Sequence, residues 1–196
     1  MKFIETIKYK NGEFADLPLH VERFYETQKL RLGSVFCEFP DLAGVVSNAV
    51  EGAQKVRIVY GEKIELIEAA PYAPRKISSL KIVETEAFDY SSKFADRKKI
   101  DKLFSMRGAC DDILICVDGF VCDTSFSNIV FIDGARRITP ETFLLDGTKR
   151  RALLRSGLVA AEPVAISDIK DFGGAILVNA MLGLSDSEPV DVSRIF

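Results

Sequence analysis

The fold of this chain is decided by residues 88–131, FDYSSKFADRKKIDKLFSMRGACDDILICVDGFVCDTSFSNIVF. Lys93 stands where the stretch changes from extended to helical, because the Tyr-Ser-Ser before it is a poor helix former and residues 97–106 are good ones. Asp118-Gly119 then separates two apolar runs, which predicts a β-hairpin ending near the acidic Asp123. An amine and a carboxylate thus lie at the ends of ordered elements and could face one pocket.

Composition limits the classes of protein that this chain can belong to. With 196 residues, of which 47% are hydrophobic, it can bury a core as one large domain or as two small lobes. The net charge is only −3, from 26 basic and 29 acidic residues, so no broad basic field predicts nucleic acid as a partner. Basic clusters at 97–99 and 149–151 fall in the first turns of predicted helices, where such clusters are commonly solvated.

The sequence predicts a cytoplasmic protein without a membrane span. The amino terminus lacks the apolar core of a secretion signal, and no run of about 18 apolar residues occurs. The four cysteines show no CxxC spacing, which favours buried thiols over disulfides or a metal site. His20 is the single histidine, so zinc sites and Ser/His/Asp or Cys/His catalysis are not expected.

The first half of the chain reads as strands around one or two helices. Pro18 suits the first turn of a helix that Gly33 would end. His20 and Arg23 share one side of that helix, and their spacing alone favours a capping histidine and a surface arginine. A second helix is predicted at 40–50. The predicted strands cover residues 3–9, 56–60, 64–70 and 80–87.

The second half continues the hairpins and then opens a helix at Thr148. The amide groups of Thr148 and Lys149 would point at whatever lies in front of this helix, which is how phosphate is commonly held. The alternative is an Asp-capped surface helix. Further strands are predicted at 128–132, 158–166 and 175–178, the last stopping at Asn179. The pattern is α+β, with two lobes at 1–90 and 91–196.

Six segments, taken together and in this order, resemble the class IV aminotransferase family. These fold-type IV pyridoxal phosphate enzymes include branched-chain and D-amino acid aminotransferases and aminodeoxychorismate lyase. The resemblance implies a short, two-lobed, D-amino acid aminotransferase-like fold that binds pyridoxal 5'-phosphate. The segments are FIETIKYKNGEF, LPLHVERF, SSKFADR, VCDTSFSNIVF, ITPETFLLDGTKRRALL and ILVNAMLGLSDSEPV.

Carried over residue by residue, the resemblance implies that Lys93 is the Schiff-base lysine. Arg23 would grip the cofactor phosphate as a planar fork, together with the amides of Thr148 and Lys149. Asn179 and Ala180 would close this cradle from the other side. Rivals to Lys93 on composition lie inside the predicted helix, facing water: Lys98, Lys99 and Lys102.

Asp123 matches the family's glutamate at the pyridine nitrogen, where a carboxylate keeps the ring protonated. Aspartate is one methylene shorter, so the strand or the ring must shift, or water must bridge them. Asn128 ends the acidic motif and Gly147 belongs to the Leu-x-Gly helix start, and both are expected to bind cofactor. Arg97 lies where the family has a residue approaching the ring hydroxyl; a solvated helix arginine is the alternative.

The closing segment NAMLGLSDSEPV is nearer to that of aminodeoxychorismate lyases than to the Thr-rich segment of transaminases. The resemblance thus implies a folate-biosynthesis lyase that releases pyruvate and 4-aminobenzoate from 4-amino-4-deoxychorismate. An amino acid aminotransferase is the second hypothesis. A non-catalytic binding protein is the third, because Asp123 is short and the chain begins almost at the first motif. Family pockets lie between lobes and are completed by a second subunit, so a homodimer is implied.

Overall fold

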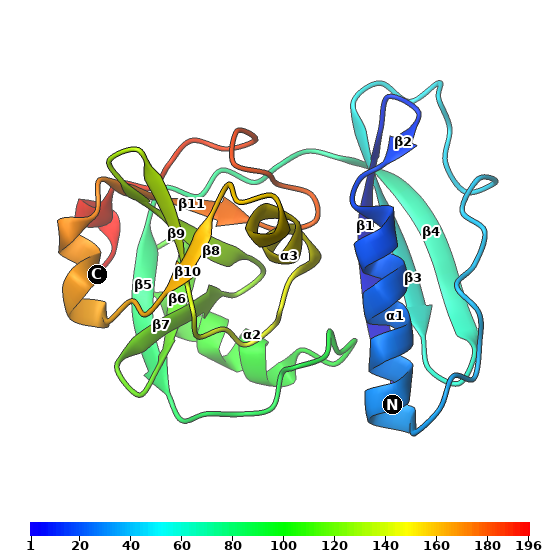
Figure 1. Ribbon diagram of the computed structural model, residues 1–196, viewed down its shortest axis with the longest axis horizontal. Helices are drawn as coiled ribbons and strands as arrows, with labels where there is room; N and C mark the ends of the chain where they lie inside the picture. The colour runs from blue at the N-terminus through cyan, green and yellow to red at the C-terminus, as the bar shows by residue number, and fades with distance from the viewer. The chain divides into compact units, whose positions relative to one another are not determined.

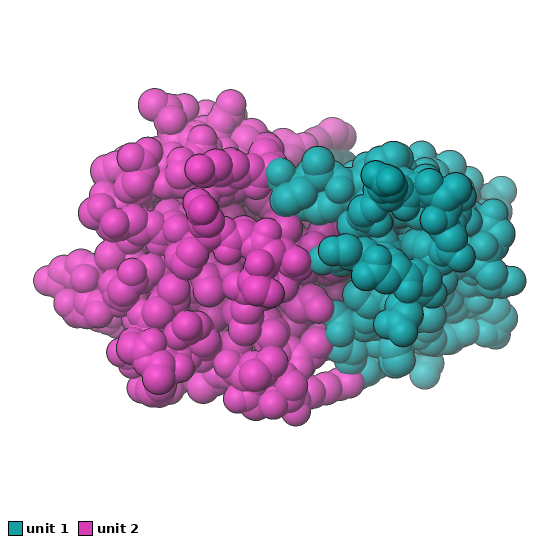
Figure 2. Space-filling view, turned by 90° about the horizontal axis from the view of Figure 1, so that it is seen from above, with its two compact units in different colours: residues 1–74, 92–96 teal, residues 75–91, 97–196 magenta.

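The computed structural model describes all residues, 1–196, and the chain forms two compact units, coloured separately in Figure 2. Unit 1 contains Met1–Pro74 and Ser92–Asp96, and unit 2 contains Arg75–Ser91 and Arg97–Phe196. This division differs from the predicted lobes 1–90 and 91–196. Two long-range pairings, described next, account for the difference.

The first pairing belongs to unit 2, where strand β5 (Leu80–Thr85) runs parallel to β6 (Asp112–Val117). Residues 75–91 therefore belong to unit 2, although they precede the predicted boundary at residue 91. The second pairing belongs to unit 1, where the amide of Ile4 donates to the carbonyl of Lys93 at 2.9 Å. The segment Ser92–Asp96, which contains Lys93, thus returns to the first strand, although the chain before and after this segment belongs to unit 2. Neither pairing is visible in local sequence patterns.

Unit 1 is an antiparallel sheet with strand order β2-β1-β3-β4 and one long helix, α1 (Figure 1). Alternate residues of β1, including Phe3 and Ile7, are fully buried against Phe24 of α1. The helix ends as predicted at Gly33, whose φ of 85° suits glycine. The bounds are β1 Phe3–Lys10, β2 Glu13–Phe14, α1 Leu17–Leu32, β3 Ala53–Tyr60 and β4 Ile64–Tyr72.

The predicted helix at 40–50 is wrong, because this segment forms consecutive turns. The side chain of Asp41 accepts a hydrogen bond from the amide of Ala43 at 2.9 Å, and Ser47 accepts one from Ala49 at 3.2 Å. Such local side-chain contacts offer the backbone an alternative to helical hydrogen bonds. The apolar residues of the segment suggested a helix, but its Asp, Ser, Asn and Gly residues determine the structure.

Unit 2 is a larger mixed sheet with strand order β10-β9-β8-β7-β6-β5, in which β11 pairs with β8 (Figure 1). The Asp118-Gly119 hairpin forms as predicted, with positive φ at both residues. The predicted strand 158–166 is shorter, because only three residues pair with β9. The remaining strands are β7 Phe120–Thr124, β8 Asn128–Asp133, β9 Arg136–Pro140, β10 Ala160–Glu162 and β11 Gly174–Val178.

Short helices complete unit 2. Helix α2 begins at Lys98, one residue after the predicted start, and α3 begins at Thr148 as predicted. The predicted α+β class is confirmed. No helix of the chain is both long and apolar enough to span a membrane. The bounds are α2 Lys98–Phe104, α3 Thr148–Arg155, and the 3₁₀ helices η1 Ser105–Arg107, η2 Ile166–Asp171 and η3 Val192–Arg194.

Candidate active site

Asp123 is fixed by a tight turn between β7 and β8. The amide of Ser127 donates to Oγ1 of Thr124 at 3.0 Å, and the amide of Thr124 donates to the carbonyl of Ser127 at 2.8 Å. This turn sets Asp123 directly opposite Asn128, whose Nδ2 donates to Oδ1 of Asp123 at 2.6 Å. The predicted acidic residue and its predicted asparagine therefore form one buried pair.

All the hydrogen-bond donors recorded for the Asp123 carboxylate are neutral. Its Oδ2 accepts hydrogen bonds from the amides of Leu144 and Leu145, at 3.0 and 2.9 Å. Burial raises the pKa of Asp123 to about 6, although the hydrogen bonds from Leu145, Asn128 and Leu144 and the positive charge of Arg150 lower it. Neutral donors offset only part of the cost of burying the carboxylate, so a cationic group beside it would be bound favourably.

The start of helix α3 lies against the same asparagine. A Cβ atom added to Gly147 would lie 2.2 Å from Oδ1 of Asn128, so a side chain at this position would force Asn128 to move. Nδ2 of Asn128 also donates to the carbonyl of Leu145 at 2.9 Å. Thr148, the first residue of the helix, is 2% exposed. The structure therefore brings four predicted residues together: Asp123, Asn128, Gly147 and Thr148.

Asn179 joins this cluster through the turn between β7 and β8. Its Nδ2 donates to Oγ of Ser127 at 2.9 Å, while its Oδ1 accepts from the amides of Met181 and Leu182 at 2.8 and 3.1 Å. Ala180 is half-buried in the same loop after β11. Lys149 is half-buried in the first turn of α3.

Arg97 contacts the turn between β7 and β8 as well. Its Nη2 donates to the carbonyl of Ser125 at 2.7 Å, and its Nε lies 3.6 Å from Oδ1 of Asp101. The side chain is therefore tied to the turn that carries Asp123, rather than simply solvated. Its predicted approach to a ring hydroxyl stays a prediction.

Lys93 belongs to unit 1, where its segment lies beside the first residues of β1. Phe94 forms an antiparallel bridge with Phe3, and the amide of Ala95 donates to the carbonyl of Lys2 at 2.9 Å. Lys93 is half-buried. The rival lysines are all exposed on α2: Lys98, Lys99 and Lys102.

Arg23 is buried in unit 1 in a cluster with Glu5 and His20. Its Nε and Nη2 donate to the two oxygens of Glu5 at 2.8 and 2.6 Å, and Nδ1 of His20 lies 2.6 Å from Oε2 of Glu5. The planar fork predicted for a phosphate is thus made with a carboxylate. A phosphate contact of Arg23 stays a prediction.

Glu5 and Arg150 are buried partners of predicted site residues that the sequence pattern did not single out. Burial acts to raise the pKa of Glu5, but the charge of Arg23 and the hydrogen bonds from His20 and Arg23 lower it to about 2. A glutamate at an inward-facing position of a strand, between Phe3 and Ile7, was the available signal. Arg150 donates to the carbonyl of Pro140 and to Asp146, both at 3.1 Å. These hydrogen bonds connect Arg150 to the segment 140–146, whose Leu144 and Leu145 amides donate to Asp123.

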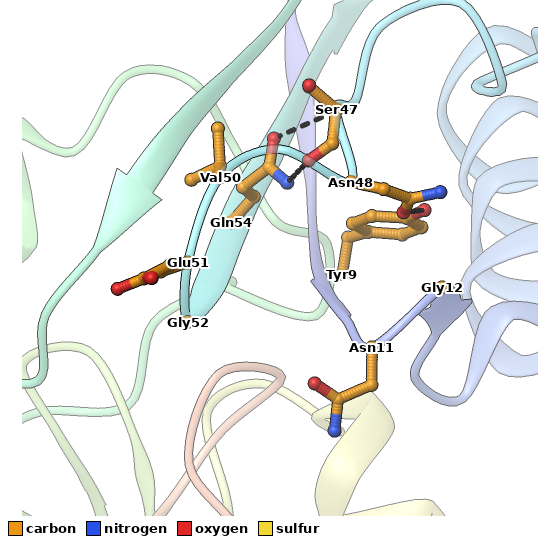
Figure 3. A pocket seen from close by; sticks show the side chains of 9 residues that line it. All are labelled: Tyr9, Asn11, Gly12, Ser47, Asn48, Val50, Glu51, Gly52 and Gln54. Atoms are coloured by element: carbon orange, nitrogen blue, oxygen red, sulfur yellow. Dashed lines mark hydrogen bonds between the residues drawn. The ribbon is translucent and has the colours of Figure 1, made fainter.

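A separate polar pocket of about 360 Å³ lies within unit 1 and contains none of the predicted site residues (Figure 3). Ser47 and Gln54 exchange hydrogen bonds across it at 3.2 and 2.6 Å, and the hydroxyl of Tyr9 donates to Asn48. Four of its polar residues, Ser47, Gln54, Tyr9 and Asn48, are therefore paired with one another. The lining residues are Tyr9, Asn11, Gly12, Ser47, Asn48, Val50, Glu51, Gly52 and Gln54.

Comparison with known proteins identifies the family. A model of the family described as "Amino-transferase class IV" matches residues 2–186. The chain belongs to this family. An uncharacterized protein from Haemophilus influenzae (strain ATCC 51907 / DSM 11121 / KW20 / Rd) is 31% identical over 183 residues, which cover 92% of this chain and 97% of the relative.

Solved structures agree with the class IV assignment. A crystal structure from Haemophilus somnus 129PT, named as a candidate 4-amino-4-deoxychorismate lyase, is 28% identical with a TM-score of 0.86, covering 93% of this chain and 97% of that one. A hypothetical aminotransferase from Mycobacterium tuberculosis, bound to alpha-ketoglutarate and PMP, is 18% identical with a TM-score of 0.78, covering 100% and 83%. The predicted fold-type IV architecture is confirmed.

Class IV proteins typically use pyridoxal phosphate, and the residues of this chain fit that group. Its pyridinium nitrogen requires a carboxylate, and Asp123 is a buried carboxylate whose recorded donors are all neutral. Its phosphate requires amide donors, which the first turn of α3 presents beyond Gly147. Its aldehyde requires a lysine amine, and the assignment of Lys93 in unit 1 to that role stays a prediction.

Proposed function

We propose that this chain is a pyridoxal phosphate-dependent lyase that converts 4-amino-4-deoxychorismate to pyruvate and 4-aminobenzoate. The observation that carries the proposal is the buried cluster of Asp123, Asn128 and the start of α3. The choice of lyase is supported by the 28% identity to the candidate lyase of Haemophilus somnus. It is also supported by the Asn-Ala segment at Asn179 and Ala180.

The residues of unit 2 would hold and polarise the cofactor, which supplies an electron sink when bound. Asp123 would accept a hydrogen bond from the ring nitrogen, and Asn128 would orient that carboxylate through its 2.6 Å contact. A cation beside Asp123 lowers the pKa of this carboxyl below about 6 and keeps it ionised at neutral pH. The amides of Thr148 and Lys149, with Asn179 and Ala180, would bind the phosphate.

Lys93 would supply the amine that binds the aldehyde and moves the proton. Its Nζ would take the proton from the carbon that bears the substrate nitrogen and return one to the departing three-carbon unit. The overall reaction balances without another reactant, because the atoms of the substrate equal those of pyruvate and 4-aminobenzoate. No oxo-acid acceptor is therefore required.

The proposal is tested by absorbance and by product release. Purified protein mixed with pyridoxal phosphate should show a visible band that borohydride abolishes, with the label on Lys93. Release of pyruvate from aminodeoxychorismate, without an added oxo acid, should follow. Lys93→Ala should abolish both, whereas Lys98→Ala, at an exposed position on α2, should change neither. Full turnover by Lys93→Ala would refute the proposal, and a wild-type protein that binds no cofactor would favour the binding-protein hypothesis.

An amino acid aminotransferase is the second candidate, since a structural neighbour was solved with alpha-ketoglutarate and PMP. Such an enzyme would use the same Lys93 to move the proton to the cofactor and keep the nitrogen there. Stable conversion of the bound cofactor to its amine form by an amino acid alone, without pyruvate release from aminodeoxychorismate, would establish this activity instead.

We also propose that the active form is a cytoplasmic homodimer, as the family resemblance implies. Sedimentation of the purified protein should give twice the mass of the 21.7 kDa chain. A monomer that turns over aminodeoxychorismate at the full rate would contradict this part of the proposal alone.

A further inference from the structure

Arg31 lies in the last turn of α1 and contacts both chain neighbours of Lys93. Its Nε donates to Oγ of Ser92 at 2.9 Å, and its guanidinium carbon lies 5.1 Å from the centre of the Phe94 ring. Ser92 is 1% exposed, so this hydrogen bond is made to a buried hydroxyl. One side chain thus holds the residues on either side of the lysine.

The main chain around Lys93 is fixed independently by β1. The carbonyl of Lys93 accepts from the amide of Ile4 at 2.9 Å, and the amide of Phe94 donates to the carbonyl of Ser92 at 2.9 Å, which closes a tight turn centred on Lys93. The rings of Phe3 and Phe94 lie 5.5 Å apart. The ring of Phe94 therefore contacts Phe3 and the guanidinium of Arg31, while the hydroxyl of Ser92 is held by its hydrogen bond from Arg31.

These contacts require the shape of arginine as well as its charge. A guanidinium can donate from its edge while its face lies over an aromatic ring, and an ammonium group cannot reproduce both contacts. A basic residue near a helix C-terminus also stabilises the helix dipole. Lys29 occupies the same last turn but is exposed and makes neither of these contacts with Ser92 and Phe94, so it supplies only the general effect on the helix dipole.

We infer that Arg31 is a positioning residue for Lys93, holding the segment 92–94 so that the lysine amine is presented in one conformation. The inference rests on the proposed role of Lys93. A reacting group that is displaced by about 1 Å can lose about 100-fold in rate. For a partial loosening of the segment we expect about a tenfold slower capture of an aldehyde.

The experiment compares Arg31→Met, Arg31→Lys and Lys29→Met with the wild-type protein. Aldehyde capture at Lys93 is timed by borohydride quenching and peptide mass analysis, with pyridoxal phosphate and with unphosphorylated pyridoxal. Pyridoxal separates the presentation of the lysine from binding of the phosphate. Hydrogen exchange of residues 92–95 is measured in the cofactor-free protein, with β3 as the internal reference.

Arg31→Met should slow capture of both aldehydes about tenfold and speed exchange of residues 92–95 but not of β3. In Arg31→Lys, the rate of aldehyde capture and the rate of hydrogen exchange of residues 92–95 should both lie between those of Arg31→Met and the wild type. In Lys29→Met, both rates should equal those of the wild type. Wild-type capture and exchange in Arg31→Met would overturn the inference, as would faster exchange in both segments, which indicates a general loss of stability. If wild-type Lys93 captures no aldehyde, the proposed function itself fails, and that result is distinct from a defect confined to Arg31→Met.

Discussion

Each unit buries one carboxylate in a segment that resembles the class IV family, and the pKa values of these two carboxylates are shifted in opposite directions. In unit 1, Glu5 is fully buried but faces Arg23 and His20, and its pKa is about 2. In unit 2, Asp123 is buried among neutral donors, and its pKa is about 6. Burial raises the pKa of both groups, so the identity of the partners decides the sign.

This comparison separates a carboxylate that is paired with a cation inside the protein from one whose hydrogen-bond donors are all neutral. Glu5 already has a guanidinium, so its cluster is complete within the protein. Asp123 has amide hydrogen bonds but no cation within hydrogen-bond distance, so a protonated ring nitrogen would improve its surroundings. The predictions below test whether the two carboxylates differ in this way.

The largest effect is expected from Glu5→Gln in unit 1. The substitution leaves Arg23 buried without its carboxylate, which should lower the free energy of unfolding by about 3–5 kcal/mol. Urea denaturation measures the loss. The matched control is Glu68→Gln, an exposed residue 3.2 Å from Arg57, which should cost less than about 1 kcal/mol. Equal losses in the two variants would show that the buried cluster is not a structural charge pair.

The second prediction concerns the pH dependence of stability. The pKa of Asp123 in the folded protein, about 6, lies above its ordinary value of 3.8, so Asp123 stays protonated to a higher pH in the folded state than in the unfolded state. Stability should therefore fall as pH rises from about 4 to 6, by roughly 3 kcal/mol. Glu5 has the opposite sign, because its pKa falls from 4.5 to about 2. Its contribution is present above pH 4.5 and is lost as pH falls toward 2.

Asp123→Asn isolates the Asp123 contribution in urea midpoints measured at pH 4, 5, 6 and 7. The variant should gain stability relative to the wild type as pH rises through this range, because it lacks the carboxyl that ionises. The control is Asp118→Asn, an exposed position on the same hairpin, which should keep the wild-type slope. A wild-type slope in Asp123→Asn would mean that Asp123 is not the group responsible.

The sequence located the elements of unit 2 better than the contacts of unit 1. Asp118-Gly119 and Gly147-Thr148 are local signals, so the hairpin below Asp123 and the start of α3 follow from neighbouring residues. The partner of Arg23 lies 18 positions away on another element, and spacing along the helix contains no information about it. A surface arginine was therefore the expectation from local pattern.

The same physical limit explains the remaining differences between sequence and structure. The position of β5 in unit 2 depends on its parallel pairing with β6, about 30 residues later, which no turn signal specifies. The return of Lys93 to β1 depends on a hydrogen bond to Ile4. Local patterns predict where elements begin, while the division into units is determined by pairings between distant strands.

The third prediction tests the close packing around Asp123 through Gly147→Ala. The added Cβ would lie 2.2 Å from Oδ1 of Asn128, so the asparagine must move away from Asp123. We expect a loss of about 1–3 kcal/mol in the free energy of unfolding and weaker retention of pyridoxal phosphate. Gly44→Ala is the control, because nothing lies within 4 Å of its added Cβ. Unchanged retention and stability in Gly147→Ala would show that Asn128 does not hold Asp123 in place.

The smallest effect is expected from Asn179→Ala, which removes the contact between the loop after β11 and Ser127. The amides of Met181 and Leu182 would lose their acceptor, at a cost of about 1 kcal/mol. Because Asn179 makes no hydrogen bond to the Asp123 carboxylate, the pH dependence assigned to Asp123 should persist. Urea midpoints at pH 4 and 7 measure both quantities together. Loss of the pH dependence of stability in Asn179→Ala would show that the titration depends on the whole turn between β7 and β8. The difference between the Asp123 and Glu5 sites would then arise from the loops that surround them and not from the two carboxylates alone.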